Sequence, residues 1–259
     1  DRERAPMYEV GVVTDDKHFS ITSAKKGTHP MDLDLSALFG SSPKTVMTDE
    51  TVVTNYEELH YYASQLQNYL VQVLQLESVA CKDWLTNKVD RCVGGKVAKQ
   101  QCAGALQLPL NNVGVMALDY NGKEGIATSI GHSPLTALIS PTAGSRNAIA
   151  EALTNIVWAP LKDGLQSVSL SANWMWACRN KGEDARLYEA VEAASNFAIE
   201  LGINIPTGKD SLSMKQKYPE GGDVIAPGTV IISAAAHCTD VQKVVEPVLK
   251  RNGGNIYYI

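Results

Sequence analysis

The feature that most constrains the fold is an alternation of buried-strand patterns with amphipathic helix patterns between residues 113 and 236. Apolar runs bounded by turn residues predict strands, and apolar residues at three- and four-residue spacing predict helices. The expected strands are residues 113–118, 125–130, 168–170 and 229–236, and the expected helices are residues 145–158 and 184–201. Because strands and helices interleave, we expect an α/β (α+β) fold in which a mixed sheet packs against helices.

The first 45 residues carry weaker signals. Residues 8–13 and 18–22 predict two short strands around a turn, and a short helix is expected near residues 38 and 39. This part is too small to build a core of its own, so we expect it to be an N-terminal appendage.

Three further helices are expected outside the alternating region. Residues 55–76 show helical periodicity with Thr54 as a candidate N-cap, and their Tyr and Leu stripe is expected to pack in a core. Residues 79–85 predict a second, shorter helix, and residues 240–250 predict a last helix that tolerates Pro247.

Composition excludes several classes of protein. The chain has 44% hydrophobic and 20% charged residues and a formal net charge of -5 without a basic cluster, which argues against nucleic acid as the main partner. No apolar run is long enough to span a bilayer, and residues 1–4 do not resemble a signal peptide. The five cysteines form no CxxC pair, so we expect a cytoplasmic protein without disulfides or a zinc site.

The stretch IPTGKDSLSM at residues 205–214 is the best candidate for a functional segment. It follows the short apolar run 203–205, which Pro206 is expected to end, and it gathers a glycine, a lysine, an aspartate and two serines. Backbone amides, lysine and serine hydroxyls bind phosphate, and a carboxylate suits magnesium. The spacing does not fit a P-loop, and a polar surface loop explains the same composition.

Four stretches in the same order resemble the phosphoribosylformylglycinamidine synthase family. They are DRCVGG at 90–95 with Gln100 and Gln101, AEALTN at 150–155, SANWM at 171–175 and PTGKDSLSM at 206–214. The resemblance runs from about Val10 to the C-terminus and implies a domain like the N-terminal domain of aminoimidazole ribonucleotide synthetase. It also implies that the chain is an internal fragment of a longer protein, holding the first domain of the second synthetase half.

The resemblance divides the chain into four parts. Residues 1–45 would be the tail of the preceding synthetase domain, residues 46–88 a helical linker, residues 89–245 the synthetase-like domain, and residues 246–259 the start of the next domain. The implied parent is an ATP- and glutamine-dependent ligase (amidotransferase) of purine biosynthesis. Its expected partners are the first synthetase half and the glutaminase domain. Because the catalytic histidine and cysteine belong to those parts, we expect no catalytic residue here and an inactive isolated fragment.

The resemblance also assigns site residues and implies Mg²⁺ and ATP or ADP as cofactors. For substrate and ATP it assigns Gly208, Lys209, Asp210, Ser211, Asp90 and Arg91. An auxiliary nucleotide would contact Asn111, and its magnesium would be held by Glu151, Asn155 and Asn112. The neutral Asn112 stands where the family usually has an aspartate, so this site has one negative charge less.

Residue spacing adds one independent argument about this second site. Glu151 and Asn155 are one helical turn apart, so both side chains project from one face, as shared metal ligands would. A solvated polar pair has the same spacing. His132, alone before a helix start, is interpreted as a capping or surface residue.

Two other functions remain open from the sequence. Selenophosphate synthetases and thiamine-phosphate kinases share the superfamily but lack GKDSLSM. A non-catalytic module that only pairs with the missing half is the alternative from a different class. The apolar strands also predict that the isolated fragment forms a homodimer, unless residues 1–85 fold back and cover them through the helix expected at 55–76.

Overall fold

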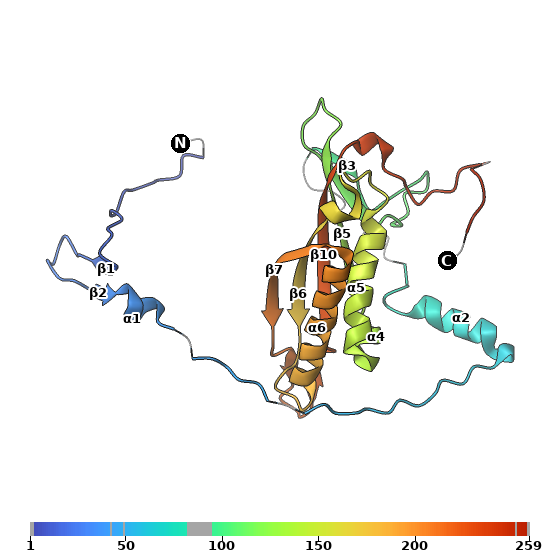
Figure 1. Cartoon of the computed structure of the whole chain (residues 1–259), viewed down its shortest axis with the longest axis horizontal. Coiled ribbons are helices and arrows are strands. Elements are labelled where there is room, and N and C mark those ends of the chain that lie inside the picture. Colours follow the sequence, from blue (N-terminus) through green and yellow to red (C-terminus); the bar gives the residue numbers. More distant parts are fainter. Residues whose placement is uncertain (1–2, 42, 49, 82–94, 252, 258–259) are drawn as a thin grey trace. The chain divides into compact units, whose positions relative to one another are not determined.

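A computed structural model describes residues 3–41, 43–48, 50–81, 95–251 and 253–257 (Figure 1). The chain divides into two compact units, Asp1–Met47 and Thr48–Ile259. The large sheet and its helices belong to the second unit. No helix in the described ranges is both long and apolar enough to cross a membrane.

The first unit is a two-stranded sheet followed directly by a short helix. Its elements are β1 (His18–Ile21), β2 (Met31–Asp34) and α1 (Leu35–Phe39). The Asp34 carboxylate accepts a hydrogen bond from the Ser36 amide at 2.8 Å and caps the helix. The short helix and the strand near residue 20 are confirmed. The expected strand at 8–13 is wrong, because a turn closed by the Gly27 amide on the Ser23 carbonyl pairs β1 with β2 instead.

Six strands form the main sheet in the order β3-β4-β5-β10-β6-β7. All neighbours are antiparallel except β6 and β7, which run parallel because helix α6 connects them. The strands are β3 (Val97–Lys99), β4 (Val113–Ala117), β5 (Gly125–His132), β6 (Ser169–Met175), β7 (Asn204–Ser211) and β10 (Thr229–Cys238).

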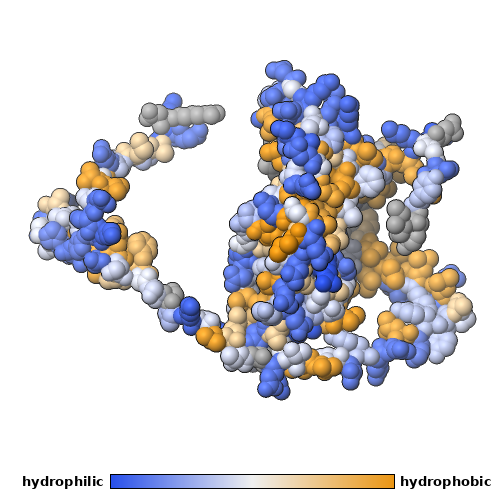
Figure 2. Space-filling model, in the orientation of Figure 1, coloured by the Kyte–Doolittle hydropathy of each residue, from blue (hydrophilic) through white to orange (hydrophobic). Residues whose placement is uncertain are grey.

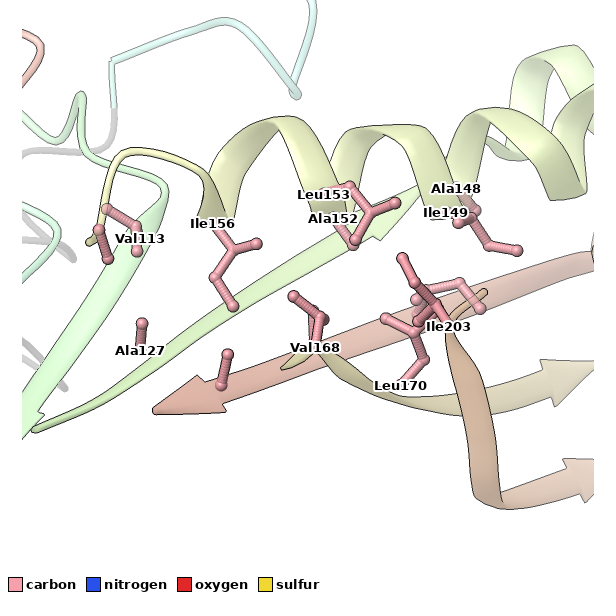
Figure 3. Close-up of a cluster of buried hydrophobic side chains, with 14 of the residues drawn as sticks. Val113, Ala127, Ala148, Ile149, Ala152, Leu153, Ile156, Val168, Leu170 and Ile203 are labelled. Carbon is pink, nitrogen blue, oxygen red and sulfur yellow. The ribbon is translucent and has the colours of Figure 1, made fainter. Parts of the chain in front are cut away.

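Helices cover one face of this sheet. In Figure 1, α5 (Pro141–Ile156) and α6 (Glu183–Leu201) lie side by side over the strands, and the short α4 (Pro134–Ile139) packs against α5. Figure 3 shows Ala152 and Ile156 pointing from α5 toward the strands, where both are fully buried. The core therefore lies between the helices and the sheet.

The prediction of a mixed sheet packed against helices is confirmed, as are the elements with long apolar patterns. β4, β5, β6 and β10 form at the four predicted strands, and α5 and α6 form at the two predicted helices. Gly202 ends α6 in the left-handed conformation, with φ of 67° and its amide bonded to the last-turn carbonyls, as expected of a glycine at a helix C-terminus.

The predicted loop at 206–211 is instead part of a strand. β7 runs through Pro206, and this is possible because β7 is the edge strand, where a residue without an amide hydrogen removes no ladder bond. A hairpin that the sequence did not indicate follows, formed by β8 (Lys215–Lys217) and β9 (Asp223–Ile225).

Several helix predictions are wrong in extent or in burial. α2 (Leu66–Gln75), preceded by the 3₁₀ turn η1 (Ala63–Gln65), leaves residues 55–62 non-helical, so Thr54 caps nothing. None of its residues is buried, contrary to the expected core packing, and Figure 2 shows apolar side chains at the surface where α2 lies.

A short 3₁₀ turn forms where the sequence predicted the last helix. Residues 240–250 form only η3 (Val241–Lys243), and another turn, η2 (Gly164–Ser167), precedes β6. The predicted helix at 79–85 falls mostly on residues 82–94, outside the described residues.

Candidate functional site

A cavity of about 690 Å³ lies against the main sheet, beside the C-terminal part of α5. Three side chains assigned from the sequence, Asn112, Glu151 and Asn155, line it together. Hydroxyl side chains of the strands line much of the remainder, namely Thr128, Ser129, Ser169, Ser171, Thr207 and Ser233. The cavity thus combines one carboxylate with neutral oxygen and hydroxyl groups, a composition suited to a polar ligand.

Glu151 and Asn155 both reach from α5 to the end of β5. The Glu151 Oε2 atom accepts a hydrogen bond of 2.6 Å from the amide of His132, and the Asn155 Nδ2 atom donates one of 3.1 Å to the carbonyl of Ile130. The Ser129 hydroxyl adds a third link, donating to the Ala152 carbonyl at 2.6 Å. The two side chains therefore share a helix face, as their spacing indicates.

The Glu151 and Asn155 side chains pair backbone groups of β5 that no neighbouring strand pairs on that side. β4 begins at Val113, opposite Ser129, so the last three residues of β5 have no strand partner on that side. Their backbone groups at Ile130 and His132 would otherwise be unpaired at the sheet edge, which is unfavourable next to a packed helix. Glu151 and Asn155 therefore serve the fold even without a ligand.

The same bonds orient the oxygens that remain. With its Nδ2 on Ile130, the Asn155 amide directs Oδ1 away from the strand, and the Glu151 carboxylate keeps its second oxygen. Asn112 adds a third oxygen donor to the cavity. These hard oxygen donors suit Mg²⁺ in type but supply a single negative charge, so phosphate oxygens would have to complete such a site. In the described ranges, no three His, Cys, Asp or Glu side chains gather into a metal-binding group.

Asn111 differs from its neighbour in the role of its side chain. Its Nδ2 atom donates 2.8 Å hydrogen bonds to the carbonyls of Gln100 and Val113, so the amide ties the segment after β3 to the start of β4. Asn111 borders a smaller cavity of about 200 Å³ that Asn112 and Asn155 also line. The Asn111 side chain thus holds the chain that presents Asn112.

The motif residues on β7 face two opposite sides of the sheet. Thr207, Lys209 and Ser211 stand opposite Ser171, Asn173 and Met175 of β6, on the side that faces away from the helices. Thr207 lines the cavity, and the Lys209 ammonium donates to the Ser211 hydroxyl farther along the strand. A cation and a hydroxyl thus lie together at the end of β7.

Asp210 lies on the other side, opposite Trp174, whose ring packs against the core under the helices. Burial raises the pKa of the nearby Cys178 thiol, and the negative charges of Asp184, Glu183 and Asp210 raise it further. That thiol is therefore kept protonated and unreactive. The structure separates Asp210 from Lys209 and Ser211, with which the sequence grouped it.

Gly208 has a clear backbone role between these residues. It pairs with Ala172 in the parallel ladder, and a side chain at Gly208 would overlap the Ala172 carbonyl. The glycine therefore permits the close approach of β6 and β7. Asp90 and Arg91, also assigned from the sequence, lie outside the described residues.

The sequence did not point to the hydroxyl groups of the cavity or to His132. Ser233, Ser171 and Thr207 are aligned across β10, β6 and β7, in one row perpendicular to the strands. The His132 Nδ1 atom lies 3.7 Å from Glu151 Oε2 at the cavity rim. Ser171 and Thr207 do lie in two of the four family-like stretches, but only the register of the strands brings them into one row with Ser233.

The family described as "FGAR-AT PurM_N-like domain" matches residues 81–237. The phosphoribosylformylglycinamidine synthase of Drosophila melanogaster is 41% identical over 97% of this chain, and that of Homo sapiens is 38% identical over 100% of it. The chain spans about 20% of the length of each of these curated relatives.

A solved structure supports the fold. The Thermotoga maritima PurL complexed with ATP superimposes with a TM-score of 0.52 at 14% identity. The match covers 90% of this chain and 33% of that one. At such low identity the likeness shows a shared fold.

Proposed function

This chain belongs to the FGAR-AT PurM_N-like domain family, and from that membership we propose that it works as one domain of a phosphoribosylformylglycinamidine synthase. The parent enzyme would use ATP and glutamine to convert formylglycinamide ribonucleotide into formylglycinamidine ribonucleotide, as a ligase with a glutaminase domain. The domain itself would be residues 89–245, with residues 1–45 ending the preceding domain, 46–88 linking the two and 246–259 opening the next.

The cavity against the main sheet is the observation that carries this proposal. It joins the AEALTN helix, the SANWM strand and the motif strand through Glu151, Ser171 and Thr207. Phosphoryl transfer depends mainly on positioning and on neutralising charge, so a domain can contribute without a nucleophile. This domain would bind nucleotide and leave chemistry on the amide to the first synthetase half and the glutaminase domain.

The motif strand would contact the phosphates of the catalytic nucleotide or the substrate. Lys209 and Ser211 share one side of β7, where an ammonium and a hydroxyl are suitable partners for phosphate oxygens. Gly208 would allow β6 and β7 to stay close together. Asp90 and Arg91, earlier in the chain, would also contact the nucleotide or the substrate. Asp210, on the opposite side, would have an indirect role.

Glu151, Asn155 and Asn112 would hold a magnesium ion together with the phosphates of an auxiliary ADP or ATP, next to Asn111. Magnesium bound there would neutralise phosphate charge. The donor set fits this role only with the phosphates present, because a single carboxylate attracts the strongly hydrated Mg²⁺ ion too weakly. Metal and nucleotide should therefore bind together.

Calorimetric titration of the purified chain with ADP, with and without Mg²⁺, tests this proposal. Binding should require both, and Glu151→Gln should weaken it about 10-fold or more by removing a charged partner. Glu192→Gln on the exposed surface of α6 is the matched control. Absence of binding in the wild-type chain would favour the rival function, a scaffold that only pairs with the other synthetase half.

Pairing through the open sheet face is the second role we propose, because apolar side chains are exposed there. Met116, Ile126 and Ile130 face away from the helices and are 47%, 46% and 58% exposed. Such a patch is typical of an interface. In the parent enzyme it would meet the first synthetase half, and in the isolated chain a second copy. The free thiols of Cys81 and Cys178 fit a reducing compartment, and we place the protein in the cytoplasm.

A further inference from the structure

One end of the second unit joins three parts of the chain at a single carbonyl group. The Tyr56 hydroxyl donates a 2.7 Å hydrogen bond to the Leu138 carbonyl. The Arg186 Nη2 atom donates to the same carbonyl at 2.9 Å and to the Ala137 carbonyl at 2.5 Å. These carbonyls belong to the last turn of α4, where no further helical amide can bind them.

The short helix α4 has little else to hold its outer end. Of its six residues only Ala137 is buried, and Leu135 and Ile139 are 77% and 66% exposed. It packs closely on Gly144 of α5, where a side chain would overlap Ala137, and it also contacts β10. Elements with few buried apolar contacts open easily, so the polar bonds at the last turn matter for its position.

The extended segment that carries Tyr56 has a second contact point. Val52 lies against Gly182, the buried left-handed residue that precedes α6, and a side chain at Gly182 would crowd the Val52 methyl group at 2.9 Å. Residues 48–62 contain no helix or strand among those described, yet two side chains four residues apart fix the segment to α4 and α6.

We propose that residues 50–62 form a docked strap, seated on the last turn of α4 and the start of α6. Tyr56 and Arg186 act as one unit through the shared Leu138 carbonyl. α4 begins just after His132, whose amide binds Glu151, so the strap connects the segment before the domain to the rim of the cavity. This inference does not depend on which ligand the cavity binds.

Hydrogen exchange in α4 tests the strap. The amides of Ala137 and Ser140 donate hydrogen bonds to the carbonyls of Ser133 and Thr136, respectively. Tyr56→Phe should speed the exchange of these two amides about 2- to 13-fold, which is the effect of losing one neutral hydrogen bond. Tyr62→Phe, which removes an exposed hydroxyl from the same segment, should leave the exchange of the α4 amides at the wild-type rate. Equal exchange in Tyr56→Phe and Tyr62→Phe would overturn the proposal.

Cleavage by a glutamate-specific protease reports on the strap itself. A protease can cut a peptide bond only when several residues on either side of it have detached from the protein surface. Cleavage after Glu57 and Glu58 should therefore rise in Tyr56→Phe by a similar factor. Cleavage after Glu9, in the other unit, is the internal reference. Faster cleavage without faster α4 exchange would show that the segment docks but does not hold α4, which contradicts the proposed coupling.

Arg186→Lys tests whether the two donors act together. Lysine keeps the charge but lacks the planar guanidinium, which here places Nη2 on both carbonyls while Nε lies 3.4 Å from the Glu183 carboxylate. It should speed α4 exchange about 10-fold or more and also increase cleavage after Glu57, although the residues are far apart in sequence. In the double variant the logarithms of the two effects should not add. Strict additivity would show two independent tethers and overturn the shared-carbonyl unit.

Discussion

The Glu151 carboxylate binds the backbone amide of His132 at 2.6 Å and thereby closes the part of β5 that β4 does not reach. One residue of the AEALTN stretch thus has a structural task and, in our proposal, a ligand task. The two tasks use different properties of the carboxylate, since the first needs an acceptor and the second needs charge. They can therefore be separated by substitution.

Glu151→Gln and Glu151→Ala should differ in stability. Gln retains an acceptor for the His132 amide, whereas Ala removes it and should lower the free energy of unfolding by about 1 kcal/mol. Urea denaturation of both variants measures the difference, with Glu192→Ala as control for helix propensity. Equal stability of the Gln and Ala variants would show that the bond contributes nothing. Both variants should weaken nucleotide–magnesium binding.

Asn112→Asp and Asn111→Asp should have opposite effects, although the residues are adjacent. Asn112→Asp adds a second carboxylate to the cavity and should strengthen Mg²⁺-dependent ADP binding by about 10-fold. Asn111→Asp loses two donors and turns a carboxylate toward two carbonyls, so it should destabilise the fold by about 2 kcal/mol. Titration and urea denaturation of both variants measure these effects. Weaker binding in Asn112→Asp would refute the donor set.

If the chain is part of the proposed synthase, Ser211→Ala should depress the synthetase turnover of that parent enzyme more than Asp210→Asn does. Ser211 lies on the same side of β7 as Lys209, and loss of a phosphate-contacting hydroxyl should cost about 10-fold in turnover. Asp210 faces the helices, so its substitution should act weakly. Glutaminase activity, assayed separately, should stay near wild type in both. Wild-type synthetase rates in Ser211→Ala would remove the motif strand from the site.

The isolated chain should associate through its open sheet face. Sedimentation equilibrium at micromolar concentration should show species above the 27.9 kDa monomer. Met116→Glu, which places a charge on that face, should shift the equilibrium to monomer, whereas Leu135→Glu on α4 should not. A monomer at all concentrations would mean that the face is covered, for example by the amphipathic helix α2.

Local sequence patterns predicted the parts of the fold that bury a continuous apolar stripe. Ile149, Leu153 and Ile156 made α5 predictable, and Val230 and Ile232 did the same for β10, because burial of these side chains determines where they lie. β7 could not be predicted in this way. An edge strand with mostly exposed residues needs no apolar alternation, so Pro206 and the polar residues after it looked like a loop.

The site was predictable where helical spacing applies and not where strand register applies. Glu151 and Asn155 are four residues apart on one helix, so their common direction followed from the sequence. Ser233, Ser171 and Thr207 come together only through the register of three strands, which the sequence does not reveal. The sequence also did not predict that Lys209 and Asp210 point to opposite sides of the sheet, because this depends on β7 being a strand.

The outermost strand also limits how copies of this domain can aggregate. Along β7, Pro206 offers no amide hydrogen and Lys209 places a charge beside the free backbone groups. A further strand therefore cannot add smoothly to that side, and end-to-end growth into a continuous fibre is discouraged. Strand addition is thus discouraged at the β7 edge, while the apolar side chains of the open sheet face remain available for association. Crowded or newly synthesised chains should accordingly end as small closed assemblies rather than as insoluble filaments.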